Sequence, residues 1–118
     1  MTGISSQFDN LQSAIQFAEQ SHSVIGQNLA NVNTPNFKTQ QLSFEELLSE
    51  FKQRQKGGLP INASFSLKEA AGLQERADGN NVDMDRELAL LKKNTLAYQT
   101  LTQLLGAKMG ILKQSIKS

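Results

Sequence analysis

Hydrophobic positions in the first third of the chain recur at alternating steps of three and four residues. The positions between them are mostly Gln, Asn and Ser, so only one stripe can be buried. This spacing is typical of an α-helix whose apolar side chains form a coiled-coil seam. We expect a helix over residues 8–33, about 39 Å long. Its seam positions are Phe8, Leu11, Ile15, Ala18, His22, Ile25, Leu29 and Val32.

The last third of the chain carries a second, longer helical pattern. Asp83, Asp85 and Glu87 open it, where the helix dipole favours acidic side chains, and Asp83 is the expected N-cap. Two apolar stripes follow, so a helix of about 33 residues must contact more than one neighbour. One stripe is Leu88, Leu91, Thr95, Tyr98, Thr102, Leu105, Met109, Leu112 and Ile116, and the other is Leu90, Ala97, Leu101, Leu104 and Ile111.

A short amphipathic helix is predicted in the middle of the chain, over residues 44–56. Ser43 and Glu46 form a capping box at its start. The pair Gly57-Gly58 ends it, because glycine is favoured just after the last turn of a helix.

Residues 59–67 change period, since apolar and polar residues alternate strictly there. Such alternation predicts an extended strand, and Pro60 restricts it to a sheet edge or an arm. A weaker capping box, Ser66 with Glu69, predicts a helical turn over residues 67–76.

These patterns together predict a mainly α-helical protein whose long terminal helices pair as a coiled-coil-like bundle. We divide the chain into the N-terminal helix and its turn at 1–38, a variable middle segment at 39–80, and the C-terminal helix at 81–118. The stripes fit both a monomeric bundle and an assembly of subunits. Two stripes on the C-terminal helix, and few large apolar groups in the middle segment, favour assembly.

The composition argues against an enzyme and against a cofactor. The 118 residues include no Cys and one His, and the net charge is +1. Thiol catalysis and zinc–thiolate sites are therefore excluded, and neither acid–base catalysis nor a nucleic-acid surface is favoured. No apolar run reaches the length of about 18 residues that a spanning helix needs, so no membrane insertion is expected. The N-terminus lacks the basic and apolar regions of a cleaved signal peptide.

Two candidate sites have simpler explanations. An EF-hand loop starting at Asp78 would need a bidentate Glu at its twelfth position, where Ala89 stands. Starting at Asp83, that position is Asn94, so the acidic run is better explained as a turn and a helix cap. His22 has no convergent ligands within a turn, and we expect a half-buried structural histidine.

A distinctive motif ends the N-terminal helix. Its matching residues are Asn28, Ala30, Asn31, Thr34, Pro35, Phe37 and Lys38. The motif resembles the signature of bacterial flagellar basal-body rod and hook proteins, in which Asn-Xaa-Ala-Asn is followed by two variable residues, Thr-Pro, Gly-Tyr or Gly-Phe, and a basic residue. Asn36 stands where that family usually has Gly, and a left-handed backbone tolerates this exchange.

A second motif opens the C-terminal helix and includes Val82 and Asp83. The stretch Gly79–Asp85, followed by Asn94–Gln99, is similar to the C-terminal signature of the short proximal rod subunits of the same family. Other proximal rod proteins tend to carry an Arg and a Glu before the corresponding stretch, and both are missing here. The resemblance covers both ends of the chain, while residues 39–78 match only in length.

The resemblance implies a structural subunit that polymerises into the rod, a helical tube transmitting motor torque. It also implies unfolded export by the flagellar type III apparatus, without a cleaved signal peptide, into the periplasmic part of the basal body. Its implied partners are other copies, other rod subunits, and the membrane-ring and adaptor proteins at the rod base. A soluble helical adaptor or export chaperone of the flagellar system is the alternative.

The expected assembly seam joins the two terminal helices, within one subunit or between subunits. Each fully buried apolar side chain along it would contribute roughly 1.5–3 kcal/mol before the entropy of ordering is subtracted. On the N-terminal helix the seam comprises Phe8, Leu11, Ile15, Ile25 and Leu29; on the C-terminal helix it comprises Leu91, Tyr98, Leu105, Leu112 and Ile116.

Overall fold

The computed structural model describes residues 4–55 and 65–117 of the chain. Most of these residues belong to the helices α1 (Ile4–Ala30), α2 (Phe44–Gln55) and α3 (Met84–Lys117). Two short strands, β1 (Gln40–Leu42) and β2 (Leu67–Glu69), pair in antiparallel orientation. The prediction of a mainly α-helical protein with paired long terminal helices is confirmed.

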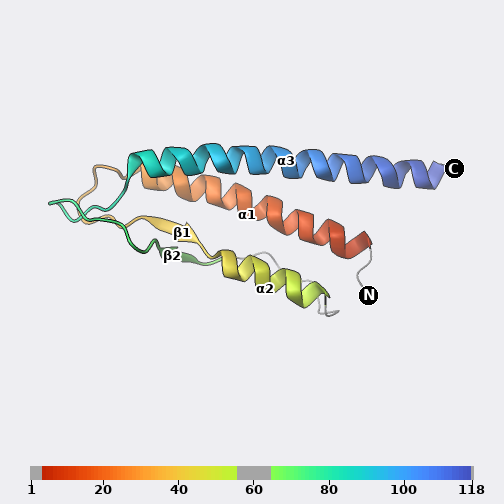
Figure 1. The fold of residues 1–118 in the computed structure, drawn as a ribbon, viewed down its shortest axis with the longest axis horizontal. Helices are drawn as coiled ribbons and strands as arrows, with labels where there is room; N and C mark the ends of the chain where they lie inside the picture. The colour runs from red at the N-terminus through yellow and green to blue at the C-terminus, as the bar shows by residue number, and fades with distance from the viewer. Residues whose placement is uncertain (1–3, 56–64, 118) are drawn as a thin grey trace.

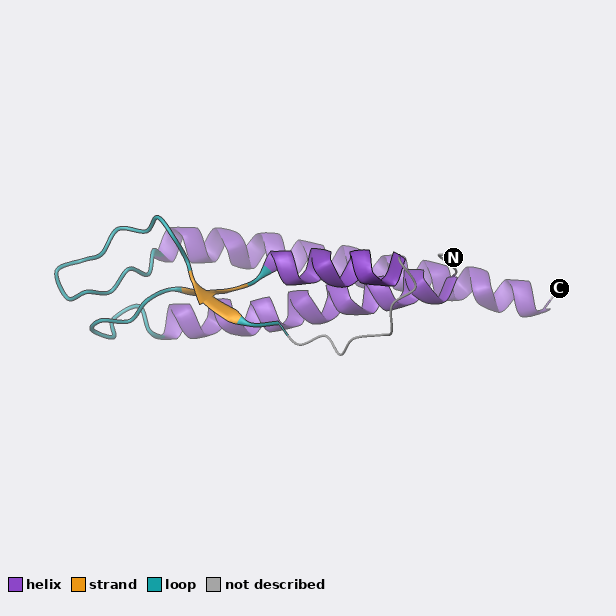
Figure 2. Ribbon diagram, turned by 90° about the horizontal axis from the view of Figure 1, so that it is seen from below, coloured by secondary structure: helices purple, strands orange, loops and turns teal. Residues whose placement is uncertain are grey.

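Helix α1 lies in the middle of the molecule. It contacts α3 on one side and α2 with β1 on the other (Figure 1). The two long helices run antiparallel, so the loops gather at one end and the chain termini at the other (Figure 1). From the side of α2, the small sheet crosses in front of the long helices (Figure 2). The result is an elongated molecule of 64 × 26 × 18 Å with a thin core.

Among the described residues, the apolar core follows α1 and is small. Most of its buried residues lie on that helix or on the short elements beside it. They are Leu11, Ala18, Val24, Ile25, Leu42, Leu47, Ala70 and Val82. Across residues 4–55 and 65–117, no helix has the length and apolar character needed to cross a lipid bilayer.

Helix α1 begins at Ile4 and ends at Ala30, whereas the sequence predicted a helix over residues 8–33. Its end is set by Asn31, whose side-chain amide donates a hydrogen bond to the Gln27 carbonyl at 2.8 Å. The Asn31 carboxamide oxygen also accepts a hydrogen bond from the Thr34 hydroxyl at 3.0 Å. Local side-chain bonds of this kind offer the backbone an alternative to continuing the helix.

The start of α3 agrees with the sequence prediction. The backbone N–H of Arg86 donates to the Asp83 carboxylate at 3.2 Å, which confirms Asp83 as the N-cap. Helix α2 also lies where it was predicted, although position 56 falls outside the described residues. Its expected capping box is not what holds Glu46, because that carboxylate accepts the backbone N–H of Ser66 at 2.9 Å.

The structure differs from the predictions for residues 59–76. Residues 59–64 lie outside the described part of the chain, and the strand that forms is Leu67–Glu69. The helical turn predicted over 67–76 is wrong. Strand β2 pairs instead with β1, in a register that places Gln40 opposite Glu69. Glu46 binds Ser66, and this contact removes Ser66 from the local cap that it would need to form with Glu69.

Candidate functional site

The end of α1 and the start of α3 meet in a polar cluster, which we call the motif junction (residues 28–40 and 76–87). Asn80 lies at its centre and is fully buried. Its amide donates to the carbonyls of Asn31 at 2.9 Å and Thr34 at 2.8 Å. Its oxygen accepts the backbone N–H of Val82 at 2.7 Å. One side chain therefore ties the turn after α1 to the segment entering α3.

Asn81 makes a second tie in the motif junction. Its side-chain oxygen accepts both the backbone N–H of Thr39, at 2.7 Å, and the Thr39 hydroxyl, at 2.9 Å. Its own N–H donates to the Phe37 carbonyl at 3.2 Å. Thr39 is fully buried by these contacts. Consecutive asparagines thus bind two different parts of the exit from α1.

Asn28 connects α1 to both β1 and α3. Its oxygen accepts the N–H of Gln40 at 3.0 Å, and its amide donates to the Gln40 carbonyl at 2.9 Å. The same amide donates to the Glu87 carboxylate at 2.7 Å. Asn28 is almost fully buried, and it satisfies the backbone of Gln40 as a neighbouring strand would.

Two left-handed residues bring the segments of the junction into close approach. Asn36 has φ 64° and Gly79 has φ 82°. A Cβ atom on Gly79 would lie 2.3 Å from the side-chain oxygen and 3.3 Å from the Cα atom of Asn36, so glycine avoids a clash at this left-handed position. The N–H of Asn36 donates to the Asp78 carbonyl at 2.9 Å. Lys38 adds an ion pair with Glu75 at 2.6 Å and a hydrogen bond to the Gly79 carbonyl.

Glu87 is the buried acid of the junction, with 1% of its surface exposed. One of its oxygens accepts the Asn28 amide and lies 3.5 Å from the Arg86 guanidinium. The other oxygen, Oε2, is buried, and none of the described residues gives it a hydrogen bond. Burial raises the pKa of this carboxyl above its ordinary value, while the Asn28 hydrogen bond and the Arg86 charge act in the opposite direction.

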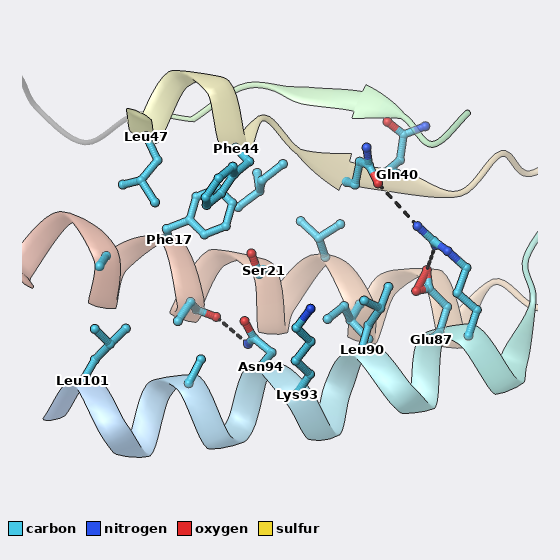
Figure 3. A pocket seen from close by; sticks show the side chains of 18 residues that line it. Phe17, Ser21, Gln40, Phe44, Leu47, Glu87, Leu90, Lys93, Asn94 and Leu101 are labelled. Atoms are coloured by element: carbon cyan, nitrogen blue, oxygen red, sulfur yellow. Dashed lines mark hydrogen bonds and ion pairs between the residues drawn. The ribbon is translucent and has the colours of Figure 1, made fainter. Parts of the chain in front are cut away.

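An apolar groove of about 480 Å³ opens beside Glu87. Helix α1 forms its floor, α3 forms one wall, and α2 with β1 forms the other (Figure 3). Phe17 on the floor meets Phe44 and Phe65 edge-on, with ring centroids 6.1 Å and 5.1 Å apart. Asn94 on α3 donates to the Ala18 carbonyl at 2.8 Å and fixes the wall to the floor (Figure 3).

Comparison with known proteins places the chain in a family. The family described as "Flagella basal body rod protein" matches residues 8–38. Flagellar basal body rod protein FlgB of Bacillus subtilis is 30% identical over 122 residues, covering 96% of this chain and 95% of that protein. The chain belongs to the FlgB family of flagellar basal body rod proteins. FlgB of Aeromonas hydrophila is 30% identical over 117 residues, covering 90% of this chain and 89% of its own. FlgB of Escherichia coli is 30% identical over 119 residues, covering 86% of each chain.

The motif residues of this FlgB-family chain divide into buried and exposed groups. Asn28 and Val82 are buried, whereas Asn31, Phe37 and Lys38 are half-buried. The exposed members are Ala30, Thr34, Pro35 and Asp83. The buried members connect segments of the junction, while Pro35 marks the turn at its surface.

Sequence reasoning missed the role of several junction residues. Asn80 and Asn81 fall within the run that the sequence analysis explained as a turn and a helix cap, Glu87 was interpreted only as an acid favoured by the helix dipole, and Arg76 was not singled out. The Arg76 guanidinium donates to the carbonyls of Val32 and, at 3.2 Å, Val82. The density of asparagines on both sides of the junction was the available signal, because each can satisfy two backbone groups at once.

The expected seam residues are brought together over only part of α3. Leu11 and Ile25 are buried. Phe8, Ile15, Leu29, Leu91 and Leu105 are half-buried, while Tyr98, Leu112 and Ile116 are exposed. His22 is also exposed, so the expectation of a half-buried histidine is wrong. Within the described residues, no three His, Cys, Asp or Glu side chains gather as metal ligands.

Proposed function

We propose that this chain is a structural subunit of the proximal rod of the bacterial flagellar basal body, and that it has no enzymatic activity. Membership of the FlgB family supports this function. One observation supports a mechanism of assembly. The apolar stripe of α3 continues to Leu112 and Ile116, and both side chains are exposed in the single chain. Exposed apolar residues in a row mark a surface for another protein.

Assembly proceeds through the terminal helices. The paired helices α1 and α3 form one elongated unit. Neighbouring subunits cover the apolar side chains that remain exposed on it. Identical subunits joined by such heterologous contacts form an open helical array. In the rod this array transmits motor torque, and the motif junction holds the two helices of each subunit in register.

The partners are other copies of this chain, other rod subunits, and the ring and adaptor proteins at the rod base. The subunit reaches the periplasmic rod through the flagellar type III export apparatus, unfolded and without cleavage of a signal peptide. The small core supports this route, because a chain that buries few apolar side chains requires little work to unfold.

Deletion of the gene in the source bacterium tests the function. We expect cells that do not swim in soft agar and whose membrane rings carry no rod in electron micrographs, with both defects rescued by the intact gene. A Leu105→Asp copy should fail to rescue, because Leu105 lies half-buried on the α1–α3 seam. A Gln99→Asp copy places the same charge at an exposed polar position of α3 and should rescue. Motile deletion cells with complete rods would favour a helical adaptor or export chaperone instead.

A further inference from the structure

The groove beside Glu87 has a shape that can accommodate a helix. Its floor on α1 includes the small residues Ala14, Ala18 and Ser21, while Phe17 beside them packs towards Phe44. Small floor residues allow a helix to approach closely. Along α3 the groove extends from Glu87 to Leu101, a length of about 21 Å in a helix.

At the opposite end of the molecule, the last turns of α3 extend beyond the start of α1. Lys108 on α3 donates to Gln7 near the start of α1 at 3.0 Å, and α3 continues beyond this point to Lys117 (Figure 1). Met109, Leu112 and Ile116 continue the stripe that contacts α1, and they are 57%, 36% and 78% exposed. We call residues 109–117 the α3 end.

We propose that the groove binds the α3 end of a second copy of this chain. The proposal rests on the proposed function, since it specifies one contact between rod subunits. Helix α3 is continuous and lines the groove with its first half, so its own end projects away from the groove (Figure 1). Nine residues of helix span about 13 Å and fit within the length of the groove.

Both surfaces gain what they lack in this contact. The apolar stripe of the α3 end extends an interface that the chain already uses, because the same face of α3 packs on α1 upstream. Lys93 on the groove wall complements the negative pole at the helix C-terminus.

The contact joins two different surfaces, so each bound copy offers a new α3 end and a new groove. Repetition gives an open array rather than a closed dimer. An isologous dimer through two α3 ends would instead stop at two copies. This difference makes the two arrangements separable by experiment.

Site-directed cross-linking tests the contact, because the natural chain contains no cysteine. One purified variant carries Ser21→Cys on the groove floor, and a second carries Gln114→Cys on the α3 end. We expect a short bismaleimide to join the two variants when they are mixed, and to join neither variant to itself. Gln99→Cys, on the exposed face of α3, replaces Ser21→Cys as the control and should give no product with the Gln114→Cys chain.

A substitution in the α3 end sharpens the test. Ile116→Asp in the Gln114→Cys chain should lower the yield of the mixed product at least about tenfold, because a charge replaces a side chain that the groove would bury. Leu96→Asp lies at a 65% exposed position away from the groove and should leave the yield unchanged. Circular dichroism of each variant establishes that it is folded.

Two results would overturn the proposal. One is a product between two Gln114→Cys chains, which indicates the isologous dimer. The other is the absence of any product between positions 21 and 114. Neither result touches the rod function, which depends on motility and on rods in the deletion strain. A strain that lacks rods, together with no product between positions 21 and 114, would retain the function and reject this contact.

Discussion

At the motif junction the α1–α3 pair is closed by buried polar side chains, whereas its opposite end carries exposed apolar ones. Asn28, Thr39 and Asn80 are buried at the junction, and each has defined hydrogen-bond partners. Met109 and Ile116 lie mostly exposed at the other end. Hydrogen bonds are directional and fix one geometry, while apolar contacts tolerate a range of partners and angles. The chain thus closes one end with its own hydrogen bonds and leaves apolar side chains exposed at the other.

The largest effect on stability is expected from Asn80→Ala. This change leaves the carbonyls of Asn31 and Thr34 and the N–H of Val82 without their buried partner. We expect the free energy of unfolding to fall by about 3 kcal/mol, measured by urea denaturation with circular dichroism. Asn33→Ala alters an exposed asparagine of the same turn and should cost less than about 0.5 kcal/mol. Equal losses in the two variants would show that the junction is not held by buried hydrogen bonds.

Two glycines allow the cost of a steric clash to be measured separately from the cost of a left-handed backbone. Gly79 and Gly72 both have positive φ, 82° and 79°, but only at Gly79 would a Cβ atom collide with Asn36. Both alanine variants carry the cost of the left-handed backbone. Gly79→Ala should lose about 1–2 kcal/mol more than Gly72→Ala in the same denaturation assay. A smaller loss at position 79 would mean that the close approach to Asn36 relaxes without cost.

Glu87 makes the junction sensitive to pH. Its pKa is raised in the folded protein above the ordinary value of 4.5, so protonation stabilises the fold. This contribution is complete below about pH 4.5 and is lost as the pH rises through the folded pKa. Glu87→Gln removes the titration and should be about 1 kcal/mol more stable than the natural chain at pH 7, because an amide replaces the unpartnered carboxylate oxygen.

The control is to measure the free energy of unfolding of the natural chain and of Glu87→Gln at each pH. Their difference cancels the titration of the other acids. That difference should shrink as the pH falls towards 4. A difference that grows on acidification would mean that Arg86 and Asn28 outweigh burial at Glu87, and that the ionised carboxylate stabilises the fold.

The smallest effect on stability is expected at the opposite end. Ile116 is 78% exposed, so Ile116→Asp should change the free energy of unfolding of the dilute monomer by less than about 0.5 kcal/mol. Thermal unfolding followed by circular dichroism at low protein concentration measures this change. A loss above about 1 kcal/mol would show that the end of α3 is already part of the core of the single chain.

The two long helices could be predicted because their signals are local. Alternating steps of three and four residues reveal the apolar stripe, and Asp83 stands directly before the helix that it caps. The pairing of β1 with β2 could not be predicted in this way, because Gln40 and Glu69 are partners far apart in sequence. The Ser66–Glu69 capping box failed for the same reason, since Glu46 binds Ser66 from a distant element.

In the motif junction, too, contacts between segments far apart in sequence could not be predicted for single residues. A buried asparagine that binds three backbone groups and an exposed asparagine in a turn have the same signature in a sequence. Asn33 lies in a turn and Asn80 follows one, yet only Asn80 is buried. Burial depends on which segments meet, and this follows from the antiparallel arrangement of α1 and α3 rather than from neighbouring residues.

The short sheet has a consequence for engineering this chain. Because Leu42 faces Leu67, the segment between them leaves and re-enters the sheet at neighbouring points. Helix α2 (Phe44–Gln55) lies within this segment and contacts α1, so a peptide tag inserted between the strands would have to leave α2 intact. The two termini would keep their native residues, and a label placed in this way would leave α1 and α3 unaltered.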